Sequence, residues 1–114
     1  MEGRASRIWK GENPTKILVL EKPLPRASAK VFEPFLREEA ARVWSLCQEG
    51  VIREIYFRAN RREAVIIMET ADADTAREIL STLPLVRENL VAFDVIPLMP
   101  YSGFERLFAL SGAS

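Results

Sequence analysis

Five side chains on three predicted strands have the types and spacing best suited to chemistry. They are Glu54, Tyr56, Arg58, Glu69 and Asp94. A carboxylate in an apolar cavity can act as a general base, a tyrosine can donate a hydrogen bond, and an arginine can hold an anionic group. Together these residue types indicate proton transfer on a small organic molecule.

The first three of these residues alternate along the predicted strand 51–59. Glu54, Tyr56 and Arg58 therefore share one face of the strand, with Ile55 and Phe57 on the other. If the polar face is turned away from the helices, the three side chains line the interior of a barrel. The alternative is an outer strand with a solvated polar face and an ordinary pair of Glu and Arg.

Glu69 ends the predicted strand 64–70, which is otherwise apolar. A carboxylate in that setting needs a partner, and we expect Arg53 or Arg58 across the hairpin to supply it. Because the register of the hairpin decides which arginine faces Glu69, the sequence leaves both open. A structural ion pair and a site residue are equally compatible with this pattern.

Asp94 lies in the middle of the predicted strand 90–98 and shares its face with Ala92 and Ile96. We predict that it points into the same cavity as Glu54. Two acids in one cavity of low dielectric constant cannot both ionise freely, which would favour proton exchange. The alternative is a solvated residue at the edge of the sheet.

Composition excludes several classes of function. The 114 residues carry 16 basic and 16 acidic side chains, so no net charge recruits nucleic acid or a membrane surface. The absence of histidine removes the commonest metal ligand, the scattered glycines form no phosphate loop, and we expect neither a metal nor a cofactor. The single Cys47 fits a reducing compartment, and no apolar stretch is long enough to span a membrane, so we predict a cytoplasmic protein.

The periodicity divides the chain into three parts: an N-terminal arm over 1–15, a domain over 16–100 and a short, turn-like C-terminal tail over 101–114. Within the domain we predict strands over 16–22, 51–59, 64–70 and 90–98, and helices over 34–48 and about 73–82. Residues 23–30 are predicted to form a loop. On the first helix the charged residues, including Glu38 and Glu39, are assigned to the face opposite the apolar stripe.

The order strand, helix, strand, strand, helix, strand is that of a ferredoxin-like α+β protomer with an antiparallel sheet. Right-handed crossovers place both helices on the same face of the sheet. The other face, which includes Val65 and Ile67, is then bare and too apolar for water. We expect a second copy to cover it, giving a homodimer or a larger ring.

Three pieces of sequence resemble one known family. They are Glu49-Gly50 before the second strand, Leu83-Pro84-Leu85 after the second helix, and the acid at position 94. In this order and spacing the chain resembles the muconolactone isomerase-like family of the dimeric α+β barrel superfamily. The resemblance implies a dimeric barrel and a proton transfer that moves a double bond in a small unsaturated lactone without a cofactor. The namesake has histidine at the position matched by Glu54.

Two functions follow from these observations. The first is a cofactor-independent isomerase, or a related enzyme, that uses carboxylate proton transfer on a small acidic or lactone-type molecule. The second is a non-catalytic module for binding a small organic ligand or for assembly, built on the same barrel. An enclosed polar cavity would favour the first function, and a core filled by side chains would favour the second.

Overall fold

The structure, a computed structural model, describes residues 14–112. Its elements are β1 (Thr15–Pro23), α2 (Ala29–Phe32), the 3₁₀ turn η1 (Glu33–Phe35), α3 (Leu36–Gln48), β2 (Ile52–Phe57), β3 (Ala64–Thr70), α4 (Ala73–Leu80), α5 (Pro84–Arg87), β4 (Val91–Pro97) and α6 (Glu105–Gly112). Residues 1–13 of the predicted N-terminal arm lie outside the described residues. The predicted strand 64–70 has the same bounds as β3.

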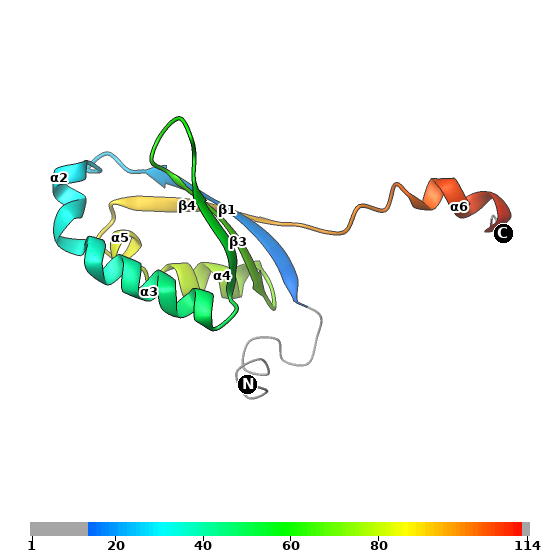
Figure 1. The fold of residues 1–114 in the computed structure, drawn as a ribbon, viewed down its shortest axis with the longest axis horizontal. Helices are drawn as coiled ribbons and strands as arrows, with labels where there is room; N and C mark the ends of the chain where they lie inside the picture. Colours follow the sequence, from blue (N-terminus) through cyan, green and yellow to red (C-terminus); the bar gives the residue numbers. More distant parts are fainter. Residues whose placement is uncertain (1–13, 113–114) are drawn as a thin grey trace.

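The sheet has the order β2-β3-β1-β4, and each neighbouring pair of strands is antiparallel. Figure 1 shows helices α3, α4 and α5 on one side of this sheet. The predicted ferredoxin-like α+β fold is therefore confirmed. β1 and β3 form the centre of the sheet, and β2 and β4 are its edges.

The core lies between the helices and one face of the central strands. Alternate residues of β1 and β3 point to the helices, and Ile17, Val19, Ile66 and Met68 are each at most 1% exposed. Leu46 of α3 packs in the same cluster, together with Ala76 and Leu80 of α4. Full burial of one such aliphatic side chain stabilises the fold by roughly 1.5–3 kcal/mol.

The other face of the sheet has no helix over it within residues 14–112. The strand register places Leu18 opposite Ile67 and Leu20 opposite Val65, and all four side chains are only partly buried. The predicted position of Val65 and Ile67 on the face away from the helices is thus confirmed. The prediction that a second copy covers this face is not tested by a single chain.

The polypeptide around the helices is more regular than the sequence predicts. The predicted loop 23–30 runs into α2, which begins after Ser28, because the Ser28 side chain accepts a hydrogen bond from the Val31 N–H at 3.2 Å. Pro34 lies in η1, before α3, where the missing N–H of a proline costs little. The Leu-Pro-Leu corner forms the short helix α5, which was not predicted.

Two predicted helix ends are confirmed. Gly50 follows α3 with a φ of 83°, a left-handed conformation that favours glycine, and its N–H bonds to the Cys47 carbonyl. Asp72 caps α4, since its carboxylate accepts a hydrogen bond from the Thr75 N–H at 2.8 Å.

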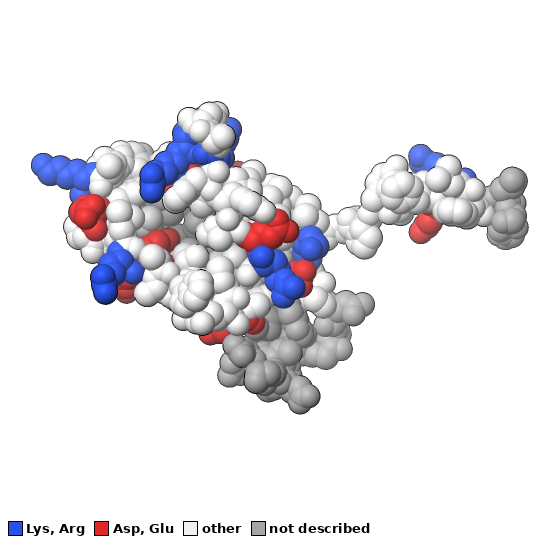
Figure 2. All heavy atoms as spheres, in the orientation of Figure 1, with Lys and Arg blue, Asp and Glu red and all other residues white. Residues whose placement is uncertain are grey.

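The C-terminal tail leaves the body of the protein beyond β4 (Figure 1). It ends in helix α6 rather than in the short turn that the sequence predicts. Figure 2 shows this projection as made mainly of uncharged residues, and Phe104, Leu107 and Phe108 are each at least 65% exposed. The radius of gyration of 17.3 Å exceeds the value of about 13 Å for a compact chain of this size. The described part of the tail thus extends away from the sheet and its helices, and Phe104 and Leu107 stay largely exposed.

Candidate functional site

The predicted site residues on β2 lie on the face of the sheet away from the helices. Glu54 pairs with Ile67 and Tyr56 with Val65, which fixes this orientation. The Tyr56 hydroxyl donates a hydrogen bond to Glu54 Oε1 at 2.8 Å, and this bond is the main cause of a raised pKa at Tyr56. Arg58 follows the end of β2 and lies 3.8 Å from Glu63 Oε1.

Glu69 forms an ion pair with a different partner from the one predicted. Lys16 Nζ lies 3.3 Å from Glu69 Oε2, whereas either Arg53 or Arg58 was expected to supply the charge. The register explains the correction, because β1 places Lys16 directly opposite Glu69. Arg53 lies in an irregularity between Ile52 and Glu54 that interrupts the pairing of β2 with β3.

Asp94 is a half-exposed residue on the edge strand β4, and its side chain retains 50% of its exposure. Lys22 Nζ of the neighbouring strand lies 2.9 Å from Asp94 Oδ1. Glu54 is on the opposite edge strand, three interstrand steps away, or roughly 14 Å. One chain therefore does not bring Asp94 and Glu54 together. A shared position inside a barrel of two copies stays a prediction.

A cavity of about 520 Å³ lies on the other face, between the sheet and helices α2 and α3. Its volume falls within the range of about 300–1,000 Å³ that small-molecule sites occupy. Most of its walls are apolar, and they include Phe32, Leu36, Val43, Ile66, Leu83 and Phe93. None of the five residues singled out from the sequence lines it.

Glu21 enters this cavity from β1. Ile17, Val19 and Glu21 are alternate residues of the strand, so the Glu21 side chain lies on the same face as the other two and points toward the helices. The last paired residues of β1 and β3 are Leu20 and Val65, and Ala64 lies one residue beyond this pair. The Ala64 N–H donates a hydrogen bond to Glu21 Oε1 at 2.8 Å. Burial raises the pKa of Glu21, against the opposing effect of this hydrogen bond, and the charge of Glu63 raises it further.

Glu39 enters the cavity from α3. It follows Leu36 by three residues and precedes Val43 by four, which places it on the inward side of the helix. The predicted position of Glu39 on the outer face is therefore wrong. The Leu85 N–H, in the first turn of α5 where no helical carbonyl is available, donates to Glu39 Oε1 at 2.9 Å.

The pKa of Glu39 is also raised. Burial is the largest cause, and the hydrogen bond from Leu85 acts against it. The negative charges of Glu21 and Glu38 add to the rise, and the Arg87 guanidinium lowers the pKa in part. Ionisation of Glu21 thus makes Glu39 harder to ionise.

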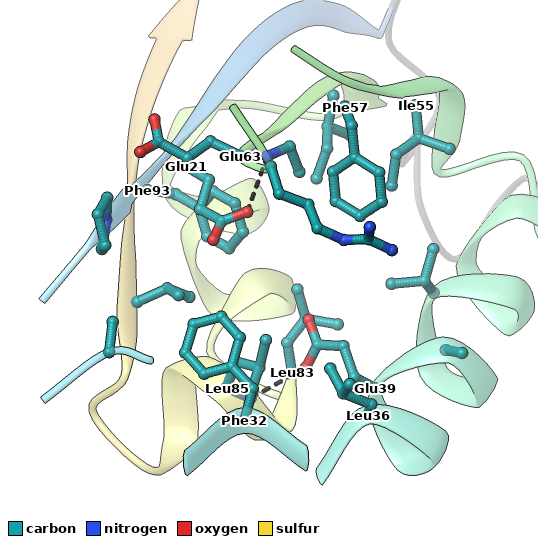
Figure 3. Close-up of a pocket in the computed structure, with 18 of the residues that line it drawn as sticks. Glu21, Phe32, Leu36, Glu39, Ile55, Phe57, Glu63, Leu83, Leu85 and Phe93 are labelled. Atoms are coloured by element: carbon teal, nitrogen blue, oxygen red, sulfur yellow. Dashed lines mark hydrogen bonds between the residues drawn. The ribbon is translucent and has the colours of Figure 1, made fainter. Parts of the chain in front are cut away.

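Figure 3 shows the Glu21 and Glu39 carboxyl groups reaching into the cavity from opposite sides. Each uses Oε1 to accept a backbone hydrogen bond, and its Oε2 makes no hydrogen bond or ion pair with the residues that the structure describes. The carboxyl of Glu63 points away from the cavity in the same view and pairs with Arg61 at 2.9 Å. Two carboxyls with raised pKa values and one free oxygen each can accept and return protons.

Sequence reasoning missed both residues, although each leaves a signal. Glu21 continues the alternation of Ile17 and Val19 on a strand that was predicted to be buried. Glu39 fits the helical spacing of Leu36 and Val43 on the apolar stripe. In both places an acid occupies a position at which the pattern requires an apolar side chain.

The rim of the cavity carries exposed apolar groups. Phe57 is 59% exposed, and the Arg62 guanidinium carbon lies 4.8 Å from the centre of its ring. Within residues 14–112 there is no cluster of three or more His, Cys, Asp or Glu residues that could hold a metal ion. The described helices are also too short or too polar to cross a membrane.

Comparison with known proteins gave one family match. Residues 21–103 match the family model described as muconolactone delta-isomerase. The matched span begins at Glu21 and contains every residue that lines the cavity. No curated protein matches the chain at a significant level.

Proposed function

Because the chain belongs to the muconolactone delta-isomerase family, we propose that its cavity moves a carbon–carbon double bond by proton transfer. The substrate is a small carbonyl compound, and protein carboxyl groups perform the chemistry without a cofactor. The observation that carries this proposal is the pair of half-buried carboxyls, Glu21 and Glu39. Each is anchored by one backbone N–H and presents one free oxygen to an apolar cavity.

The coupling between the two carboxyls supports a division of roles. Burial raises the pKa of both carboxyls, and the charge of Glu21 raises the pKa of Glu39 further. We therefore assign Glu21 the role of general base, and Glu39 in its protonated form the role of hydrogen-bond donor. Such a pair resembles other sites in which the surroundings set two carboxyls to different protonation states.

The proposed step balances within the site. The Glu21 carboxylate removes a proton from the carbon next to the substrate carbonyl, and the electron pair of that C–H bond moves into a dienolate. Protonated Glu39 donates a hydrogen bond to the dienolate oxygen, where negative charge develops. Glu21 then returns its proton to the far carbon of the dienolate, and the double bond has moved with no net loss of atoms.

The test is isomerisation of a β,γ-unsaturated five-membered lactone without a carboxyl group, followed by NMR in deuterium oxide. We expect Glu21→Gln to slow the reaction about 100-fold or more, the usual contribution of general acid–base catalysis. Glu39→Gln should slow it less, because an amide still donates a hydrogen bond. Glu38→Gln is the matched control, one position away and exposed.

An unchanged rate in Glu21→Gln, or no exchange of deuterium into the lactone by the unaltered protein, would refute this function. Binding of the lactone without exchange would instead identify a binding module. That is the non-catalytic alternative for the same cavity.

The opposite face of the sheet offers a second candidate site. The bond from Tyr56 to Glu54 places a tyrosine proton beside a carboxylate, on a face that a second copy would enclose. Glu69 and Asp94 lie on the same face, with Arg58 near one end of β2. Loss of activity in Glu54→Gln or Asp94→Asn, with normal activity in Glu21→Gln, would move the chemistry to this face.

We also propose that the protein associates with itself through this open face. The family forms dimeric α+β barrels. The partly buried residues Leu18, Leu20, Val65 and Ile67 form a continuous apolar band across the two central strands. Burial of that band against its symmetry mate supplies a hydrophobic contact that water cannot.

A further inference from the structure

We propose that Arg61 and Glu63, in the hairpin between β2 and β3, are positioning residues for Glu21. Their ion pair holds the Glu63 carboxyl away from the cavity and keeps the Ala64 N–H on the Glu21 carboxyl. This inference rests on the proposed function, in which Glu21 is the general base. Arg61 and Glu63 act through Glu21 rather than on the substrate.

Glu63 occupies the position that orients the anchor of Glu21. The Ala64 N–H belongs to the planar peptide bond between Glu63 and Ala64, so the backbone conformation of Glu63 sets the direction of this donor. The Glu63 backbone is fixed on both sides. Its N–H donates to the Arg61 carbonyl at 2.8 Å, and its carbonyl accepts from the Arg58 N–H at 2.9 Å. With the backbone held in this way, the Ala64 N–H donates to Glu21 Oε1 at 2.8 Å.

The side chain of Glu63 is fixed as well. Arg61 Nε donates to Glu63 Oε1 at 2.9 Å, and Arg58 Nη1 lies 3.8 Å from the same oxygen. The Glu63 side chain keeps only 17% of its exposure, whereas those of Arg58 and Arg61 keep 41% and 55%. Two exposed guanidinium groups thus offset the charge of a carboxyl that is mostly buried at the cavity wall.

The direction of the Glu63 side chain matters for the charge inside the cavity. The charged residues of the lining are Glu21 on β1, Glu39 on α3, and Arg62 and Glu63 on the hairpin. Burial is the largest cause of the raised pKa of Glu21, the hydrogen bond from Ala64 opposes it, and the charge of Glu63 adds to the rise. Figure 3 shows the Glu63 carboxyl turned away from that of Glu21. Without Arg61, this third carboxylate would be free to turn toward Glu21.

An ion pair that only stabilises the hairpin makes a different prediction. Removing either partner breaks the same contact, so both substitutions would then act in the same direction. A positioning role predicts opposite effects on Glu21. Glu63→Gln removes a negative charge from beside Glu21, whereas Arg61→Gln removes the positive charge that offsets it.

The test is a carboxyl-carbon NMR titration of Glu21 in the unaltered protein and in three single variants. We expect the pKa of Glu21 to fall in Glu63→Gln and to rise in Arg61→Gln. Arg77→Gln is the matched control, because Arg77 pairs with Asp74 at a similar distance, 2.8 Å, on α4 and outside the cavity lining. It should leave the titration of Glu21 unchanged.

Hydrogen exchange at Ala64 tests the geometry separately. Arg61→Gln releases the Glu63 side chain, so the Ala64 amide should exchange with deuterium oxide faster, by about threefold or more at the same pH. Glu63→Gln keeps an oxygen that can accept from Arg61, so its Ala64 amide should exchange at the rate of the unaltered protein.

Shifts of the same sign in Glu63→Gln and Arg61→Gln, or no shift in either, would overturn the inference. So would an unchanged exchange rate of the Ala64 amide in Arg61→Gln, or a shift in Arg77→Gln as large as that in Arg61→Gln. Neither measurement involves a substrate. These failures are therefore distinct from failure of the proposed function, which the deuterium exchange of the lactone reports.

Discussion

Carboxyl groups on the two faces of the sheet differ in what surrounds them. On the open face Glu54 accepts a hydrogen bond from Tyr56, and Glu69 and Asp94 pair with the lysines of β1. On the helix-covered face Glu21 and Glu39 have backbone donors on one oxygen and a cavity on the other. Charged or hydroxyl partners are typical of acids with structural roles, whereas an acid that keeps a free oxygen in an apolar wall is a candidate for proton transfer.

The largest expected effect comes from truncating neighbouring residues of β3. Ile66 faces the helices and is 1% exposed, and Ile67 lies on the open face. Ile66→Ala should lower the free energy of unfolding by about 3 kcal/mol, as for other buried aliphatic residues. Ile67→Ala should lower it by about 1 kcal/mol in the single chain, since this residue is only partly buried.

Urea denaturation measures both variants, and light scattering of Ile67→Ala reports association. Equal losses of stability at the two positions, with no change in mass for either variant, would remove the distinction between a packed and an open face.

The tail offers a second way to examine association. Phe104, Leu107 and Phe108 are largely exposed on a tail that extends away from the body, so we expect the tail to pack on another copy. A chain that ends at Tyr101 should then show a lower mass by light scattering at micromolar concentration. An unchanged mass together with a lower melting temperature would instead mean that the tail packs on its own subunit.

A smaller effect separates two adjacent acids of α3. The fold raises the pKa of Glu39, so Glu39 contributes stability below its ordinary pKa of 4.5, and this contribution is lost as pH rises through the folded value. Glu39→Gln cannot ionise and keeps the hydrogen bond from Leu85. It should therefore be more stable than the unaltered protein at pH 8, by no more than about 1 kcal/mol for a half-exposed carboxyl.

Glu38 is the control for this prediction, because the expected change in stability on its substitution has the opposite sign. Its hydrogen bond with Arg87 lowers the pKa of Glu38, so its contribution is present above 4.5 and lost as pH falls. Glu38→Gln should be slightly less stable than the unaltered protein at pH 8. Thermal melts across pH 4 to 8 compare the two variants. A change in stability of the same sign at pH 8 in both variants would contradict the opposite pKa shifts of Glu38 and Glu39.

The smallest effect is expected at Asp94. Asp94 lies half exposed on the edge strand β4 and pairs with Lys22, so Asp94→Asn should change the free energy of unfolding by no more than about 0.5 kcal/mol. A loss well above this, accompanied by a lower mass, would place Asp94 inside an interface between copies.

Much of the fold follows from local patterns in the sequence. The apolar run 64–70 predicts the strand β3, and Gly50 and Asp72 mark real helix ends. The short helices α2 and α5 were missed, because helices of four residues are too short for an apolar period to show. The helix of the tail, α6, was also missed, because the sequence analysis predicted a short turn for these residues.

The cavity on the helix-covered face was not predicted, for a physical reason. The alternation of side chains along a strand assigns an acid to one face of the sheet, but it does not show which face encloses a cavity. The acids of the open face were chosen as candidates because they interrupt apolar strands. Glu21 and Glu39 become a pair only when β1 and α3 pack together, and their anchors Ala64 and Leu85 lie 43 and 46 residues away in the chain. No local window contains that arrangement.

The most direct test of the account is a carboxyl-carbon NMR titration of Glu21, Glu39 and Glu38 in the unaltered protein. We predict that Glu21 and Glu39 titrate above the ordinary pKa of 4.5, in coupled steps, and that Glu38 titrates below it. Substitution of Glu21 by Gln should then lower the pKa of Glu39, because the charge that opposes its ionisation is gone. Ordinary pKa values at both Glu21 and Glu39 would contradict the claim that this cavity holds a proton-transfer pair.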